Sequence, residues 1–328
     1  MMKKILNDPG DVLTEMLAGF VQMHDHVELL EDANVITRRD VQKHKVAIIS
    51  GGGSGHEPAH AGFVGDGMLD AAVCGQVFTS PTPDQVLAAI KHVNRGDGVF
   101  LVIKNYSGDC MNFEMAKEMA EMEGIDVDFV IVNDDVAVFD SSFTEGRRGV
   151  AGTIFVHKIL GAASKAGASL AQIKALAEDI VHHLASVGFA VSPATVPEIG
   201  KPGFELADNE MEFGIGIHGE PGYRREPLKT SRETAVELLD KIEKETDFSS
   251  KQVAVLINGM GATPLMEQYV FANDVMTLLN ERGYTVVFKK IGNYMTAIDM
   301  AGMSLTLFEI TDNKWLNYLQ TPTAAPGW

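Results

Sequence analysis

The chain has 328 residues, of which 45% are hydrophobic and 22% charged, and its formal net charge at pH 7 is -18. Such a length accommodates about two domains with cores of their own, and the negative charge argues against a large nucleic-acid-binding surface. The amino-terminal residues lack the apolar run of a signal peptide and no later run is long enough to span a membrane, so we expect a cytoplasmic protein.

The first half of the chain alternates predicted helices and strands. A helix is predicted to begin after Asp8 and Pro9, where a capping carboxylate precedes a first-turn proline. Apolar runs predict strands at 46–50, 69–75, 99–103 and 129–132, and helices are predicted from the capping box at 82–85 and over 112–123. This alternation is typical of a doubly wound, mainly parallel sheet that binds ligands at the carboxyl edge of its strands.

A glycine run, Gly51 to Gly55 with Ser54 inside it, closes the first of these strands and is followed by His56. Glycines after a buried strand permit a sharp turn and a close approach of backbone to a ligand. A dinucleotide fingerprint would need Gly or Ala in place of His56, a phosphate loop would need Gly-Lys-Ser/Thr, and a nucleophile elbow would need another glycine at 56. A site at this turn and a tight turn without chemistry therefore both stay open.

Metal ligands are scarce in the sequence. The only cysteines, Cys74 and Cys110, are too few for a disulfide framework or a cysteine-rich metal site. Methionines at helical spacing over 111–122 are better explained as core packing than as thioether ligands. We therefore expect no metal in this chain.

The second half predicts a smaller α/β domain. Helices are expected over 153–166 and 169–186, and a segment at 187–210 with prolines, glycines and little periodicity suggests a boundary, giving domains 1–190 and 191–328. A helix over 231–246 and strands at 253–257, 285–288 and 305–308 follow, with a second glycine loop at 258–263. We expect an extended tail from 322 that packs back on the first domain.

Residues 211–218 alternate as a strand does, with Gly214, Gly216 and His218 on one face. Glycine weakens a strand unless close approach requires it, so another backbone or a ligand is expected against this face. His218 then lies at the strand exit, where a structural and a chemical role are about equally plausible. From the residues alone, a small polar ligand handled by histidine and carboxylate is the furthest conclusion.

Six stretches, in order, resemble the dihydroxyacetone kinase family and specifically its substrate-binding subunit. They are ISGGGSGHEPAH (49–60), VFTSP (77–81), KNYSGD (104–109), GRRGVAG (146–152), GIGIHGEPG (214–222) and NGMGAT (258–263). The resemblance covers nearly the whole chain. It implies that His218 forms a covalent hemiaminal with the ketone of dihydroxyacetone and that His56 and Asp109 act on its hydroxyls, with substrate contacts at Gly53, Ser54, Gly55, His56, Ser80, Lys104, Asp109 and His218.

Such chemistry suits these residue types. A neutral imidazole such as His218 is a nucleophile, and a reversible bond to a ketone carbon can hold a ligand that offers few other contacts. Glycerol, which has no carbonyl, should be rejected. Asp109 can take the proton of the terminal hydroxyl as it attacks phosphorus, with His56 as hydrogen-bond partner or alternate acid/base, and the sequence does not decide between them.

The resemblance also implies partners. We expect no cofactor in this chain, because the phosphoryl donor should be a separate subunit that holds ADP and magnesium and is recharged by the phosphotransferase system. A homodimer is expected. The alternatives are a non-catalytic paralogue that binds dihydroxyacetone as a transcriptional co-activator, and a free-standing sugar-binding module; the intact stretches at 78–80 and 104–109 favour the enzyme.

Overall fold

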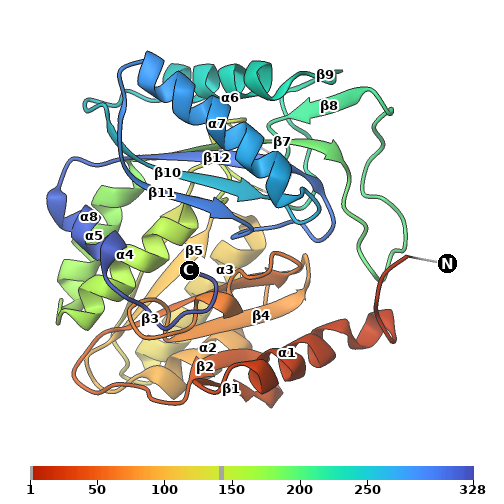
Figure 1. The fold of residues 1–328 in the computed structure, drawn as a ribbon. Helices are drawn as coiled ribbons and strands as arrows, with labels where there is room; N and C mark the ends of the chain where they lie inside the picture. The colour runs from red at the N-terminus through yellow and green to blue at the C-terminus, as the bar shows by residue number, and fades with distance from the viewer. Residues whose placement is uncertain (1–2, 140–143) are drawn as a thin grey trace.

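The computed structural model describes residues 3–139 and 144–328, which form two six-stranded sheets with helices around them. Figure 1 shows the sheets in two separate layers, with β3 and β4 in the first and β10 to β12 in the second. This arrangement of two α/β domains is the fold class that the sequence predicted.

The first sheet has the strand order β1-β2-β4-β3-β5-β6. Its strands are β1 (Val27–Leu30), β2 (Val35–Arg38), β3 (Ala47–Ser54), β4 (Ala71–Val77), β5 (Val99–Lys104) and β6 (Val127–Val132). The pairs β4-β3, β3-β5 and β5-β6 are parallel, whereas β1 and β2 form an antiparallel edge that the sequence analysis missed. Parallel central strands bring their carboxyl ends to one edge of the sheet.

Helices cover both faces of this sheet. One face packs on α2 (Pro83–Val93) and α3 (Ser107–Met122), and the other on α1 (Val12–Met23), α4 (Thr153–Lys165) and α5 (Leu170–Val181). The predicted capping box forms at the start of α2, where Thr82 and Gln85 satisfy each other's backbone amides.

Two local expectations for the first domain are wrong. The glycine run does not end the strand, because β3 continues through Gly53 to Ser54 and the chain turns only at Gly55, whose φ is +100°. The methionine stripe is not core: Met111, Met115 and Met122 are 63%, 47% and 80% exposed, because Phe113, Ala116 and Ala120 fill the buried face of α3 instead.

The second sheet has the order β11-β10-β12-β7-β8-β9. Its strands are β7 (Leu184–Ser192), β8 (Glu210–Phe213), β9 (Arg224–Pro227), β10 (Gln252–Gly259), β11 (Thr285–Gly292) and β12 (Ala301–Glu309). The sequence analysis assigned the first residues of β7 to a helix. The expected boundary at 190 falls inside β7, all of whose residues belong to the second sheet.

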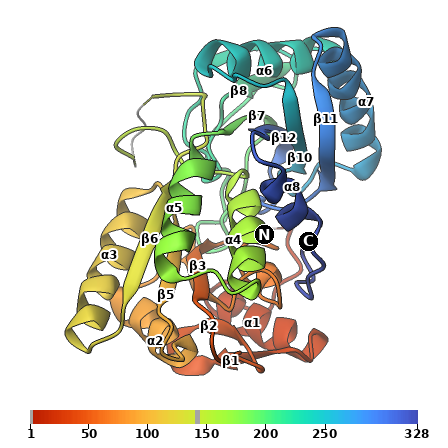
Figure 2. The same ribbon diagram turned by 90° about the vertical axis from the view of Figure 1, so that its left-hand side faces the viewer.

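The second sheet also has two covered faces. One packs on α6 (Ser231–Glu245) and α7 (Leu265–Glu281), and the other faces the first domain, where Leu256 and Phe308 join a core that includes Phe155 of α4. Figure 2 shows α4 between the two sheets and α8 (Asn313–Gln320) beside it. The two domains therefore share one continuous hydrophobic core.

The carboxy-terminal tail lies against the first domain. The amide of Gly327 donates to the carbonyl of Gly62 (2.7 Å) and that of Ala324 to the carbonyl of Asp66 (3.1 Å). Trp328 stacks on Phe288 of β11, with ring centroids 5.9 Å apart. The tail thus contacts both domains.

Candidate active site

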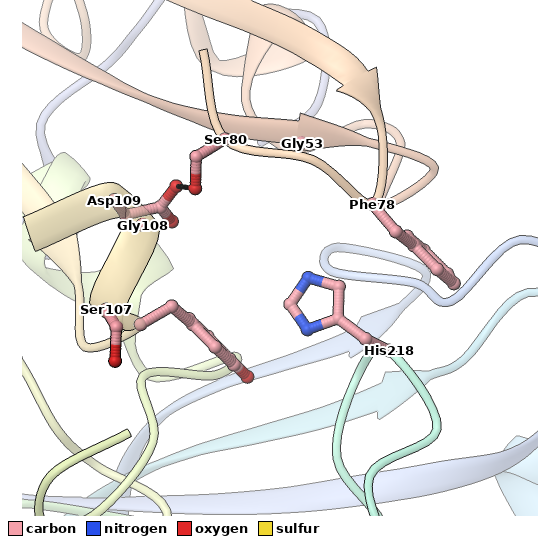
Figure 3. A pocket seen from close by; sticks show the side chains of 8 residues that line it. Gly53, Phe78, Ser80, Ser107, Gly108, Asp109 and His218 are labelled. Carbon is pink, nitrogen blue, oxygen red and sulfur yellow. Dashed lines mark hydrogen bonds between the residues drawn. The ribbon is translucent and has the colours of Figure 1, made fainter. Parts of the chain in front are cut away.

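A cavity of about 180 Å³ lies where the first sheet's carboxyl edge meets the second domain. Figure 3 shows His218 entering from one side and the Ser80–Asp109 pair on the other. The first domain supplies residues from the end of β3, the segment after β4 and the start of α3, and the second domain supplies His218. The lining residues are Gly53, Phe78, Ser80, Tyr106, Ser107, Gly108, Asp109 and His218.

The segment that carries His218 is a loop and not the predicted strand. β8 ends at Phe213, because Gly214 takes a φ of +78°, where a Cβ would lie 2.5 Å from the ring of Tyr223. The carbonyl of Gly214 accepts a 2.7 Å hydrogen bond from Nη2 of Arg148, which is buried and paired with Asp135. Arg148, from the 146–152 stretch, thereby fixes the base of the His218 loop.

Glu220 holds His218 at two points. Its carboxylate accepts from Nδ1 of His218 (2.8 Å) and from the backbone amide of the same residue (2.9 Å). Glu220 is 2% exposed, and burial alone would raise its pKa, but the charge and hydrogen bond of His218 and the charge of Arg148 lower its pKa to about 2. Glu220 is therefore ionised at neutral pH.

Gly216 makes this contact possible. A Cβ at Gly216 would lie 2.1 Å from Oε2 of Glu220 and 2.8 Å from Nη1 of Arg148. The sequence analysis expected a backbone or a ligand against this glycine, and the neighbours are instead a carboxylate and a guanidinium of the chain itself.

His56 is buried completely and contacts His218. Its Nδ1 lies 2.7 Å from the carbonyl oxygen of Thr296, and its Nε2 lies 3.1 Å from Nε2 of His218. Burial, followed by the nearby charges of His218 and Lys104, places the pKa of His56 well below its ordinary value. Burial therefore opposes a positive charge on His56.

These contacts fix the tautomers of both histidines. A carbonyl oxygen can only accept, so Nδ1 of His56 carries a hydrogen, and the Glu220 carboxylate likewise requires a hydrogen on Nδ1 of His218. Both Nε2 atoms then hold lone pairs unless one more proton is present. The 3.1 Å Nε2···Nε2 contact is a hydrogen bond only when the pair shares that proton, which the negative charge of Glu220 balances.

Asp109 stands across the cavity in a second buried cluster. It is 3% exposed, accepts a hydrogen bond from Oγ of Ser80, and lies 3.1 Å from Nζ of the fully buried Lys104. The first turn of α3, which precedes the helix predicted over 112–123, contains Asp109 and lines the cavity. Lys104 and Ser80 therefore hold the carboxylate in one orientation.

Aromatic rings form the remaining walls. Phe78 stacks on His56 with centroids 5.0 Å apart, and Tyr106 meets His218 edge-on at 4.7 Å. Burial is the main reason that the pKa of Tyr106 lies well above its ordinary value, so its ring is uncharged. These rings restrict the directions in which His218 can point.

The glycines of β3 are required by the chain's own packing around the cavity. A Cβ at Gly52 would lie 2.5 Å from Nζ of Lys104, and one at Gly53 would lie 2.5 Å from the backbone nitrogen of Thr79. The run thus lets the lysine and the segment after β4 approach the strand closely.

The expected site residues do not all meet in the cavity. Gly53, Ser80, Asp109 and His218 line it, whereas His56 and Lys104 lie behind, in contact with His218 and Asp109. The hydroxyl of Ser54 donates to the carbonyl of Gly75 (2.7 Å), and Gly55 packs against Phe78. Neither Ser54 nor Gly55 lines the cavity.

Several residues at the site were not predicted. Phe78 and Tyr106 stand inside stretches that carried the resemblance, and Glu220 follows His218 by two residues, so each had a sequence signal. The carbonyl of Thr296 had none, because it lies 240 residues from His56 and acts through its backbone.

The described residues contain neither a cluster of metal ligands nor a helix suited to span a membrane. Among residues 3–139 and 144–328, no group of three or more His, Cys, Asp or Glu side chains is arranged to hold a metal ion. No helix in the same part of the chain is both long enough and apolar enough to cross a bilayer.

Comparisons with known proteins find a family and close relatives. The family model described as the Dak1 domain matches residues 18–327. The chain is 57% identical, over 99% of both chains, to the PTS-dependent dihydroxyacetone kinase, dihydroxyacetone-binding subunit DhaK, of Lactococcus lactis subsp. lactis. It is 44% identical to the DhaKLM operon coactivator DhaQ of the same organism, over 99% of this chain and 100% of the relative.

A solved structure named dihydroxyacetone kinase operon co-activator Dha-DhaQ matches with a TM-score of 0.92 at 44% identity, covering 98% of this chain and 99% of that one. The family resemblance and the two-domain α/β fold expected from the sequence are both confirmed.

Proposed function

We propose a function from one established premise: this chain belongs to the Dak1 domain family. Its function is that of the dihydroxyacetone-binding subunit of a dihydroxyacetone kinase that depends on the phosphotransferase system. The observation that carries the proposal is a small cavity with a nucleophilic imidazole, His218, on one side and a fixed carboxylate, Asp109, on the other.

Capture begins with the proton shared by His56 and His218. His56 takes this proton on its Nε2, which frees the lone pair on Nε2 of His218. That lone pair attacks the carbonyl carbon of dihydroxyacetone, a C–N bond forms, and the C=O π electrons move to oxygen. His56 then gives the proton to this oxygen, which becomes the hydroxyl of the hemiaminal.

The charges balance through this step. The pair carries one positive charge before capture, and afterwards the alkylated ring of His218 carries it as an imidazolium that still donates from Nδ1 to Glu220. Glu220 therefore stabilises both the resting pair and the adduct. Release of the product runs the same steps backwards.

Phosphoryl transfer uses the other side of the cavity. We assign the removal of the terminal hydroxyl proton to Asp109 because His56 acts on the carbonyl oxygen, whereas Asp109 lies with Ser80 across the cavity. Lys104, whose Nζ lies 3.1 Å from Asp109, holds that carboxylate in its orientation. The product is dihydroxyacetone phosphate.

The donor and the assembly complete the proposal. ADP and magnesium belong to a separate donor subunit, and this chain supplies the substrate side only. A homodimer is consistent with β11, which forms one end of the second sheet, and with exposed apolar residues on the neighbouring α7, Leu265, Met266, Tyr269 and Val270. Sedimentation of the purified chain tests that state.

The alternative is a co-activator that binds dihydroxyacetone without phosphorylating it, as the 44% identical relative suggests. Such a protein needs His218 but has no need of the Lys104–Asp109–Ser80 cluster. The presence of this cluster in a buried, bonded arrangement favours the enzyme.

Two measurements test the proposal. Dihydroxyacetone labelled with ¹³C at its carbonyl carbon should give a tetrahedral-carbon signal with the wild-type chain and none with His218→Ala. Mixing the wild-type chain with the ADP-containing donor subunit and its phosphotransferase components should then give dihydroxyacetone phosphate. Adduct without product would favour the co-activator, and no adduct would overturn the capture step.

A further inference from the structure

The second glycine stretch, 258–263, begins with Asn258, whose side-chain amide forms two donated and two accepted hydrogen bonds. Asn258, 1% exposed at the end of β10, donates to the carbonyl of Met295 (2.7 Å) and to Oγ of Ser304 (3.1 Å). Its Oδ1 accepts from the backbone amides of Tyr294 and Met295, both at 2.9 Å. Three of these four bonds go to one short segment, 293–298.

The other side of segment 293–298 holds the loop that carries His56. The carbonyl of Thr296 accepts from Nδ1 of His56 (2.7 Å), and the amide of Thr296 donates to the carbonyl of His56 (3.1 Å). The amide of Ile298 donates to the carbonyl of Gly55 (2.8 Å). The segment therefore bridges β10 in the second domain and the catalytic histidine in the first.

The backbone of this segment is held against its own preference. Ile298 has a φ of +57°, which is sterically unfavourable for a β-branched residue. Gly261 allows the arrangement, since a Cβ there would lie 2.1 Å from the carbonyl oxygen of Ile298. Such a conformation persists only when surrounding contacts determine it, and the three bonds of Asn258 to Tyr294 and Met295 are among them.

We infer that Asn258 is a positioning residue for substrate capture, acting through the carbonyl of Thr296 on His56. It fixes the acceptor that keeps the hydrogen of His56 on Nδ1, so that Nε2 faces His218 as a base. The inference deepens the proposed capture step and rests on it for its consequence, but the effect on the His56 tautomer stands without it.

Two substitutions separate geometry from charge. Asn258→Asp keeps the side-chain volume and the two bonds accepted by Oδ1, but turns an oxygen toward the carbonyl of Met295. Asn258→Ser is too short to hold the segment and adds no charge. Both should reduce the fraction of His56 protonated at Nδ1, read from ¹⁵N ring shifts in histidine-labelled protein, with His56→Asn used for assignment.

Capture should weaken in both variants by about tenfold or more, measured with ¹³C-labelled dihydroxyacetone. For Asn258→Asp, the pH profile of capture should also move to higher pH, because a buried negative charge favours protonated His56. Ser304→Ala is the matched control: it removes the one bond of Asn258 that leaves the segment untouched. Its tautomer ratio and profile should equal those of the wild type.

A wild-type tautomer ratio and capture profile in folded Asn258→Asp and Asn258→Ser would overturn the inference and leave Asn258 a structural residue. If neither variant folds, the same readouts are taken on Asn258→Thr, whose β-branched side chain suits strand β10 but is too short to bond Tyr294 and Met295 as the amide does; an unchanged ratio there would also overturn the inference. If the wild-type chain forms no adduct, the proposed function fails. The comparison of His56 tautomers would still test the role of Asn258 in that case.

Discussion

Replacing Glu220 by Gln tests the charge balance at His218. A glutamine keeps the size of the side chain but can accept only one of the two hydrogen bonds, because its NH₂ group faces the other donor. Hydrogen bonds to charged groups contribute about 1.5–3 kcal/mol and neutral ones about 1 kcal/mol. A loss of about 2 kcal/mol therefore corresponds to roughly thirtyfold weaker capture.

The assay is a titration with ¹³C-labelled dihydroxyacetone that follows the tetrahedral-carbon signal. Glu212→Gln is the matched control, because Glu212 is also buried and accepts from Gly222 of the same loop (2.8 Å) without contacting His218. Equal capture by the Glu220 and Glu212 variants would refute the role assigned to Glu220.

The pH dependence of this effect has a definite sign. The pKa of Glu220 is about 2, below its ordinary 4.5, so its contribution is present above pH 4.5 and is lost only as the pH falls toward 2. Glu220 itself therefore does not titrate between about pH 5 and 8. Because its charge balances the proton that His56 and His218 share, Glu220→Gln should lose that proton at lower pH, and the ratio of wild-type capture to variant capture should rise with pH; a constant ratio would show that Glu220 does not hold this proton.

Three further predictions concern other parts of the molecule. Asp109→Asn should keep the ¹³C adduct but lose phosphoryl transfer with the donor subunit by on the order of a hundredfold or more; full activity would remove Asp109 from its role. Gly216→Ala should weaken capture as Glu220→Gln does, because its Cβ would displace the Glu220 carboxylate, and wild-type capture would refute this. Burial lowers the pKa of His157 to about 3, so its neutral form stabilises the fold above its ordinary 6.5 and that stability is lost as the pH falls toward 3. Between pH 6.5 and 5 the wild type should therefore lose about 2 kcal/mol more than His157→Gln in urea unfolding, and parallel losses would contradict this.

The sequence was most informative where local patterns determine local structure. The apolar run at 99–103 became β5 and the capping box at 82–85 began α2, because burial on both faces and amide capping are properties of neighbouring residues. β7 was missed because its apolar sequence continues that of the helix before it, and only pairing with β12 distinguishes the two. Exposure of the α3 methionines likewise depends on which face meets the sheet.

The site was less predictable than the fold. His56 and His218 could be singled out as histidines beside glycines, but their roles came from the family resemblance. The 3.1 Å contact between them and the support from Thr296 depend on segments that meet only after both domains fold. Ser54 was expected to contact substrate, and the sequence gives no sign that its hydroxyl bonds the carbonyl of Gly75 and that it lies outside the cavity lining.

The division of the site between domains has a consequence for how capture is controlled. His56 follows β3 and Asp109 lies in α3 of the first domain, while His218, the proposed nucleophile, is on a loop whose base is held by Arg148 of the first domain. In the proposed capture step the Nε2 atom of His218 has to align closely with the carbonyl carbon, so we expect the packing between the domains, which positions His218, to affect capture. Under this proposal, a ligand too small to draw the domains together by its own contacts would be held by a site that the shared core has already assembled.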